Sequence, residues 1–188
     1  MSAEAAGFTV WLTGLPSAGK TTIAGLLVAE LERRGVTVES LDGDVVRTHL
    51  SKDLGYSRAD RDTNVARIGW VASRLVRHGI PVVVALVSPY NEARAQARTL
   101  VEEHGPFVEV WVKASVEECM NRDRKGLYAK AAAGEITGMT GVDDPYEPPE
   151  SPDVVLDAVG VDAPENCRLL VAHLERFGVI SAAQAVAP

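Results

Sequence analysis

TGLPSAGKTT, residues 13–22, interrupts an apolar run with two glycines, a lysine and two threonines. Gly14, Gly19, Lys20 and Thr21 match the phosphate-binding pattern of Gly, four residues, Gly-Lys and Ser or Thr. In such a loop, inward-turned backbone amides and the start of the following helix form a site for oligophosphate oxygens. We therefore predict that a nucleoside triphosphate binds here.

The motif predicts a separate task for each polar side chain. We expect Lys20 to reach the β- and γ-phosphates and Thr21 to present its hydroxyl to Mg²⁺, which spreads the charge of the group in transfer. Lys20 is therefore both a catalytic and a binding candidate. Further residues predicted to bind ATP in this loop are Gly14, Ser17, Ala18, Gly19 and Thr22.

Apolar runs of strand length alternate with helical patterns along the chain. We predict strands at 8–13, 36–41, 80–88, 107–114 and 153–158, and helices at 21–34, from the capping residue Ser57 onward, and at 91–104, 115–133 and 164–177. This alternation is typical of a parallel sheet with helices on both faces. The predicted fold class is α/β, a five-stranded parallel sheet of the P-loop NTPase or nucleotide-kinase-like type.

The length predicts one domain over residues 1–188. Residues 131–153 are rich in Gly, Pro and acidic residues, so we predict a long loop that acts as a lid, with the lid spanning about 125–150. We assign no chemistry to the C-terminal tail, 178–188. The three tryptophans, Trp11, Trp70 and Trp111, are expected in the core.

The net charge of −7 and the lack of a basic block argue against nucleic-acid and membrane-surface binding. No apolar run approaches the ~18 residues of a membrane helix. Cys119 and Cys167 have neither metal-ligand spacing nor a disulfide pattern, so we expect packed thiols in a reducing cytoplasm.

The remaining motifs favour a kinase over the other users of a triphosphate. No Asn-Lys-x-Asp motif for guanine is present, and the only Asp-x-x-Gly, at 157–160, comes too late for a GTPase switch. The third strand ends at Ser88 without the aspartate that completes the Mg²⁺ site of ATPase motors.

The acceptor site is predicted from LDGDVVR, residues 41–47, directly after the second strand. This places Asp42, Asp44 and Arg47 at the carboxyl edge of the sheet, where ligands of such folds bind. Asp44 is our candidate base for an attacking hydroxyl, and Arg47 is suited to a phosphate or sulfate oxygen. For Asp42, capping of a short following helix is an equally natural role.

Arg61 and Asn64 precede Val65 and Ile68 by one helical turn, so they continue the core-facing stripe. An inward-facing Arg61 needs a partner, either a bound anion or an internal salt bridge with Asp42 or Asp44. Arg67 lies off this stripe and is expected at the surface.

Several motifs together resemble the adenylylsulfate kinase (APS kinase) family. They are GLPSAGKTT, LDGDVVR, DLGYSRADRDTNVARIG, VSPY and KGLYAKAAAGEITGMTGVDDPYEPPESPDVVLD, which cover most of residues 8–158. The resemblance implies ATP-dependent phosphorylation of the 3′-hydroxyl of adenosine 5′-phosphosulfate, giving 3′-phosphoadenosine 5′-phosphosulfate.

The resemblance also implies residue roles. Asp44 matches the catalytic aspartate, and Tyr56 matches a residue that stacks on the acceptor adenine. The other residues implied or predicted to bind the acceptor are Asp42, Arg47, Arg61, Asn64, Val87, Ser88, Lys125, Met139 and Thr140, and Arg122 is added to the ATP-binding set. A homodimer and an association with ATP sulfurylase are the implied assemblies.

This sequence departs from the family pattern at some positions. Val45 replaces an asparagine, Asn91 an arginine, Thr137 a lysine and Met139 a phenylalanine, while Pro16 and Ser17 replace Ser and Gly. Of these departures, Val45, Asn91 and Met139 motivate a second hypothesis, a kinase of the same fold with another small hydroxyl or nucleotide acceptor. A third is a nucleotide-binding regulator or silent partner domain.

Overall fold

The computed structural model describes residues 7–182. Their five strands form one parallel sheet in the order β2-β3-β1-β4-β5. The strands are β1 (Thr9–Thr13), β2 (Glu39–Asp42), β3 (Val82–Ala85), β4 (Phe107–Lys113) and β5 (Val154–Asp157). The predicted five-stranded parallel sheet is confirmed.

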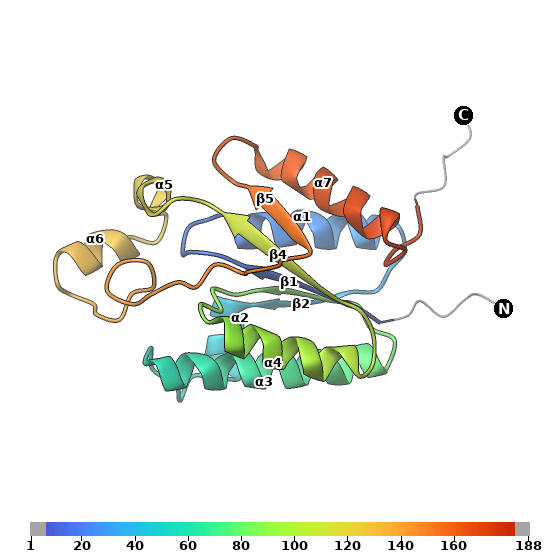
Figure 1. The fold of residues 1–188 in the computed structure, drawn as a ribbon, viewed down its shortest axis with the longest axis horizontal. Helices are drawn as coiled ribbons and strands as arrows, with labels where there is room; N and C mark the ends of the chain where they lie inside the picture. The colour runs from blue at the N-terminus through green and yellow to red at the C-terminus, as the bar shows by residue number, and fades with distance from the viewer. Residues whose placement is uncertain (1–6, 183–188) are drawn as a thin grey trace.

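Helices cover both faces of this sheet, as Figure 1 shows. Helices α1 and α7 pack together over one face, and α3 and α4 pack together over the other. The helices are α1 (Lys20–Arg33), α2 (Gly43–His49), α3 (Arg58–Arg77), α4 (Asn91–Glu102), α5 (Val116–Arg122), α6 (Leu127–Ala132) and α7 (Ala163–Arg176).

Strand β1 lies at the centre of the sheet and is buried along its whole length. Because strand side chains alternate between faces, Val10 and Leu12 pack into the core beneath α1 and α7, while Trp11 packs into the core beneath α3 and α4. The Trp11 ring stacks on Phe107 at 5.6 Å between centroids. Two apolar layers therefore fix the strand that leads into the glycine-rich loop.

Helix α3 begins directly after Ser57, the capping residue from which the sequence analysis predicted it. The Ser57 hydroxyl accepts from the Asp60 backbone N–H at 3.2 Å and donates to the Asp60 carboxylate at 2.7 Å. This start sets the rotation of the helix, so that Asn64 and Ile68 are buried. Arg67 pairs with Asp53 at the surface.

The predicted helix at 115–133 is wrong, because the chain turns between two short helices. Helix α5 ends at Arg122, and Gly126 adopts a left-handed conformation with φ +65° before α6 begins. The Asp123 carboxylate accepts from the backbone N–H groups of Tyr128 and Ala129, so it caps α6.

The prediction that Trp70 belongs to the core is also wrong, because its side chain is 57% exposed. Its neighbour Gly69 faces α4 instead, so closely that an added Cβ would lie 2.9 Å from the Ala97 Cβ. Contact between α3 and α4 through small residues turns Trp70 outward. Trp11 is fully buried and Trp111 is half-buried.

The first residues of the predicted tail are packed. Val179 and Ile180 fold back on the end of α7, their N–H groups donating to the Leu174 carbonyl, and Ile180 is buried. The rest of the predicted tail, 183–188, lies outside the described residues. Within 7–182, none of the helices combines the length and the apolar character that a bilayer crossing requires.

Arg94 is a fully buried cation that joins four parts of the fold. It pairs with Glu109 of β4 at 2.8 Å and donates to the Ser88 carbonyl at 2.6 Å, to the Glu147 carbonyl at 2.8 Å and to the Asn91 side chain. It therefore ties the end of β3, the start of α4 and the end of the lid segment to the sheet.

Removal of this cation should destabilise the fold strongly. We expect Arg94→Ala to lower the free energy of unfolding by about 3–5 kcal/mol, because the largely buried Glu109 keeps only a longer ion pair with Arg98, at 3.7 Å, and the Ser88 and Glu147 carbonyls lose their donor. The measurement is urea denaturation. Arg33→Ala is the matched control, since Arg33 is 63% exposed and pairs only with Glu30 at the helix surface, so its unfolding midpoint should hardly change. Equal midpoints for the two variants would contradict the role of Arg94.

Candidate active site

The glycine-rich loop begins, directly after β1, at a backbone position that only glycine can occupy. Gly14 has φ +152°, and a Cβ built there would lie 2.5 Å from the Val112 carbonyl oxygen of β4. At the other end of the loop, Gly19 has φ +108° and caps α1 without a side-chain hydrogen bond. The backbone of the loop therefore lies close against the sheet, and the N-terminus of α1 is left without a side-chain cap.

Lys20 folds back onto this loop. Its ammonium donates to the Gly14 carbonyl at 2.9 Å and to the Leu15 carbonyl at 2.8 Å, and the residue is 8% exposed. Burial lowers the pKa of Lys20 to about 8, while the charges of Asp42 and Asp44 oppose this shift. An anionic ligand in the loop would raise the pKa of Lys20 again and so favour its protonated, charged form.

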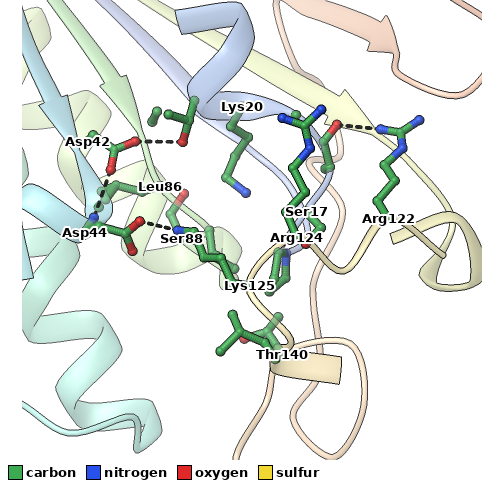
Figure 2. Close-up of a pocket in the computed structure, with 18 of the residues that line it drawn as sticks. Ser17, Lys20, Asp42, Asp44, Leu86, Ser88, Arg122, Arg124, Lys125 and Thr140 are labelled. Carbon is green, nitrogen blue, oxygen red and sulfur yellow. Dashed lines mark hydrogen bonds and ion pairs between the residues drawn. The ribbon is translucent and has the colours of Figure 1, made fainter. Parts of the chain in front are cut away.

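The two aspartates after β2 have different environments. Asp42 accepts from the Thr21 hydroxyl at 2.7 Å and, through its other oxygen, from the Asp44 N–H at 3.0 Å. The capping role considered for Asp42 is therefore present, together with a contact to the loop. The Asp44 carboxylate bonds instead to the Lys125 ammonium, and Figure 2 shows both beside Lys20 and Asp42.

On the acceptor side, two arginines lie near Tyr56. The Arg47 guanidinium lies 4.2 Å from the centroid of the Tyr56 ring and donates to the Leu54 and Gly55 carbonyls. The alternative of an Arg61 salt bridge with Asp42 or Asp44 is wrong, because Arg61 pairs with Asp144 of the lid segment, at 3.6 Å.

The wall beside these arginines comes from α3 and from the chain after β3. Asn64 is buried, and its amide oxygen has no hydrogen-bond partner among residues 7–182. Ser88 adopts φ +38°, and its side chain accepts from Trp11 Nε1 at 3.1 Å. The Val87 carbonyl accepts from the Thr13 hydroxyl at 2.7 Å, so β1 fixes this turn.

Arg122 links the glycine-rich loop to the chain after β5. It donates to the Ala18 carbonyl at 3.3 Å and to the Ala158 carbonyl, and pairs with Glu118 at 3.0 Å. In Figure 2, Arg122 and Asp44 lie on opposite sides of Lys20.

Most of these groups line one cleft of about 950 Å³ at the carboxyl edge of the sheet. Of the predicted site residues only Gly14, which lies against β4, is outside this lining. The lining residues that were predicted are Ser17, Ala18, Gly19, Lys20, Thr21, Thr22, Asp42, Asp44, Arg47, Tyr56, Arg61, Asn64, Val87, Ser88, Arg122, Lys125, Met139 and Thr140.

Comparison with known proteins gives the family of the chain. The family model described as adenylylsulphate kinase matches residues 6–157. The chain belongs to the adenylylsulphate kinase family. An adenylyl-sulfate kinase of Synechococcus sp. (strain JA-3-3Ab) is 51% identical over 174 residues, which are 93% of this chain and 97% of the relative. An adenylyl-sulfate kinase of Chloroflexus aurantiacus is also 51% identical, over 93% of this chain and 92% of the relative.

Solved structures of adenylylsulphate kinases agree with the fold. An APS kinase of Mycobacterium tuberculosis, solved in complex with AMPPNP and APS, has a TM-score of 0.87 and 42% identity, covering 90% of this chain and 98% of that chain. A hexameric APS kinase from Thiobacillus denitrificans has a TM-score of 0.74 and 36% identity, over 94% of this chain and 30% of that chain. A gluconokinase from Sinorhizobium meliloti, 17% identical with a TM-score of 0.59 over 92% of this chain and 93% of its own, shares the fold alone.

The adenylylsulphate kinase cleft also contains residues that the sequence reasoning missed. Arg124 lies beside Lys125 in the lining, and the chain after β5, residues 158–163, forms the wall next to Arg122. The position of residues 158–163 could have been inferred, because β5 is parallel to the other strands and must end at the same edge. For Arg124 no motif signalled a position in the cleft.

The close approach of Gly14 to β4 generates a prediction on stability. We expect Gly14→Ala to destabilise the fold by more than about 1 kcal/mol, since the new Cβ meets backbone that cannot move aside. Gly25→Ala is the matched control, because Gly25 lies in α1 with open space around its Cα. That variant should gain about 0.4–1 kcal/mol. Denaturant titration of both variants gives the comparison, and a stable Gly14→Ala protein would contradict it.

Proposed function

We propose that this chain transfers the γ-phosphate of ATP to the 3′-hydroxyl of adenosine 5′-phosphosulfate, giving ADP and 3′-phosphoadenosine 5′-phosphosulfate. The observation that carries the proposal is the single cleft, in which the glycine-rich loop, Asp44 and the Tyr56–Arg61 region face one another. Membership of the adenylylsulphate kinase family supports the same reaction.

The donor triphosphate would bind at the N-terminus of α1. The first amides of a helix have no partner within it, and α1 has no side-chain cap, so these N–H groups suit phosphate oxygens. The Lys20 ammonium would exchange its two loop carbonyls for phosphate oxygens, which hold the positive charge more strongly than neutral acceptors do.

The residues around Thr21 fit a magnesium ion. The Thr21 hydroxyl has a single proton and donates it to Asp42, so its lone pairs remain available as ligands. Mg²⁺ keeps several waters and binds substrate phosphates, so one hydroxyl ligand from the protein is enough at such a site. When bound, Mg²⁺ would neutralise charge on the phosphate oxygens.

Asp44 would act as the general base. As its carboxylate takes the proton of the 3′-hydroxyl, the 3′-oxygen forms a bond to the γ-phosphorus and the bond from phosphorus to the β,γ-bridging oxygen breaks, so that ADP leaves. Lys125 bonds one oxygen of this carboxylate, so the other oxygen is open to the hydroxyl. Lys125 could also neutralise the phosphoryl oxygens, since it lines the same cleft as Lys20.

The acceptor would lie between α3 and the lid segment. Tyr56 offers an exposed ring for the adenine, and the buried Met139 offers a polarizable thioether for its other face. Arg47 and Arg61 supply charge for the phosphosulfate, and a ribose hydroxyl could satisfy the buried amide of Asn64.

We infer a cytoplasmic setting from the two buried free cysteines and the use of ATP. Self-association as a homodimer and association with an ATP sulfurylase are further proposals. They are supported by the hexameric relative and by a probable bifunctional SAT/APS kinase of Sorangium cellulosum, which is 49% identical over 93% of this chain and 29% of that protein.

The central test of the proposed function is acceptor-dependent ADP release. The wild-type chain should turn over with adenosine 5′-phosphosulfate, and Asp44→Asn should lower kcat by about 10²–10⁴-fold while nucleotide affinity is retained. Asp53→Asn is the matched control, since Asp53 pairs with Arg67 at the surface and lies outside the cleft. Turnover with another hydroxyl compound but not with the phosphosulfate would refute the proposed acceptor.

The lowered pKa of Lys20 gives a second prediction, on proton uptake. At pH 8.5 much of Lys20 is neutral in the free protein, because burial lowers its pKa to about 8. A bound diphosphate raises that pKa again, so ADP with Mg²⁺ should bind with proton uptake, measured by calorimetry in buffers of different ionisation enthalpy. Lys20→Arg should show no such uptake, since arginine stays protonated. Equal uptake by both proteins would show that Lys20 is not the group involved.

A further inference from the structure

Asp144 of the lid segment is held in place by a group outside that segment. The Tyr90 hydroxyl donates to both oxygens of the Asp144 carboxylate, at 2.8 and 3.0 Å, and the Thr140 hydroxyl donates to one of them at 3.3 Å. The Asp144 side chain is only 18% exposed. This carboxylate is therefore fixed by partners on two sides, although it belongs to a long loop.

Tyr90 is a rigid anchor for this carboxylate. It is 1% exposed and stands at the start of α4, packed in the apolar layer beneath α3 and α4. Burial, together with the bond to Asp144, raises the pKa of Tyr90 to about 12, so its hydroxyl keeps its proton and remains a donor at physiological pH. Through Tyr90, the Asp144 carboxylate is held in a fixed position relative to the apolar core.

Arg61 joins the two sides of the proposed acceptor site. Its Nε donates to the Tyr56 carbonyl at 3.0 Å, and its Nη2 donates to the Gly138 carbonyl at 2.6 Å. Tyr56 and Met139, the residue after Gly138, are the proposed covers of the adenine. One guanidinium therefore fixes the spacing of both covers.

The charge of Arg61 is buried and needs compensation. Its side chain is 10% exposed, and burial lowers its pKa while Asp144 opposes that shift. In the part of the chain that the structure describes, Asp144 is the only carboxylate within 4 Å of the guanidinium nitrogens. Of the five N–H donors of an arginine, two are used by the carbonyls, so three remain for an anion in the cleft.

We propose that Asp144, fixed by Tyr90, is a positioning residue for the acceptor: its charge, 3.6 Å from Arg61 Nε, keeps the buried guanidinium in the cleft, where the two carbonyl bonds turn its free N–H groups toward the anionic part of that substrate. The inference rests on the proposed function, because that function identifies the anion as the phosphosulfate. Asp144 itself touches neither substrate in this arrangement. Its effect is transmitted through Arg61 and is confined to the acceptor.

A purely structural role for Asp144 leads to a different expectation. If the carboxylate only stabilised the lid segment, then weakening that segment elsewhere would have the same effect. Glu147 provides this comparison, because its carboxylate lies in the same segment, accepts from the Asn91 N–H and pairs with Arg58, but is outside the cleft lining and forms no ion pair with Arg61.

The test is a steady-state comparison of KM values for the two substrates. Asp144→Asn should raise KM for the phosphosulfate about tenfold or more, as for loss of a charge-assisted contact, while KM for ATP stays within about twofold. Tyr90→Phe keeps the carboxylate but removes its anchor, so it should give a smaller rise with the same selectivity. Glu147→Gln should give no selective rise. Thermal unfolding of each variant confirms that it is folded.

A double-variant cycle isolates the route through Arg61. In an Arg61→Ala background, Asp144→Asn should cause no further rise in KM for the acceptor. The proposal is overturned by an undiminished effect in that background, by equal rises in both KM values, or by equal effects of Glu147→Gln and Asp144→Asn. If the wild-type chain phosphorylates a different anionic acceptor, the proposed function fails, and the same KM comparison with that acceptor decides the role of Asp144.

Discussion

The bond of the Lys20 ammonium to the Gly14 and Leu15 carbonyls is the interaction around which the cleft is organised. It places a cation inside a loop that Gly14 presses against β4, and it supplies two neutral acceptors in place of water. Neutral acceptors compensate a buried charge only in part, as the lowered pKa of Lys20 indicates. The loop is therefore stable as folded and still has a favourable interaction to gain from phosphate oxygens.

Cations that are held by neutral backbone carbonyls also occur on the acceptor side of the cleft. Arg47 and Arg61 are both held by backbone carbonyls, and Arg61 has one carboxylate at a distance greater than that of a direct hydrogen bond. The chain as a whole carries a net charge of −7, so these local cations, and not the overall field, must attract anionic substrates. Asp42 and Asp44 line the same cleft as these cations, where Asp42 contacts Thr21 of the loop and Asp44 contacts Lys125.

The sequence was sufficient for the elements that local chemistry determines. The glycine pattern predicted the loop, the Ser57 and Asp60 pair predicted the start of α3, and the buried strands predicted the sheet, because each signal lies within a few residues. Features that depend on distant partners were missed. The turn before α6 depends on one aspartate and one glycine inside a helical pattern, and the exposure of Trp70 depends on the contact of Gly69 with Ala97. The carboxylate partner of Arg61 lies 83 residues further along the chain, beyond any local pattern.

The departures from the family pattern differ in their bearing on the acceptor. Val45 is 57% exposed and lies outside the cleft lining, and Asn91 accepts from Arg94 within the buried network that ties α4 to the sheet. Neither side chain is placed to contact an acceptor in the cleft. Met139 does line the cleft, yet its backbone is fixed by Asp143 and its side chain is 5% exposed. A flexible thioether in a fixed backbone can still cover an aromatic base, because dispersion contacts need proximity more than a defined ring plane. The argument for a different acceptor therefore rests on Met139, whose chemistry is compatible with adenine, and on Thr137, which also lines the cleft and lacks the charge of the family's lysine.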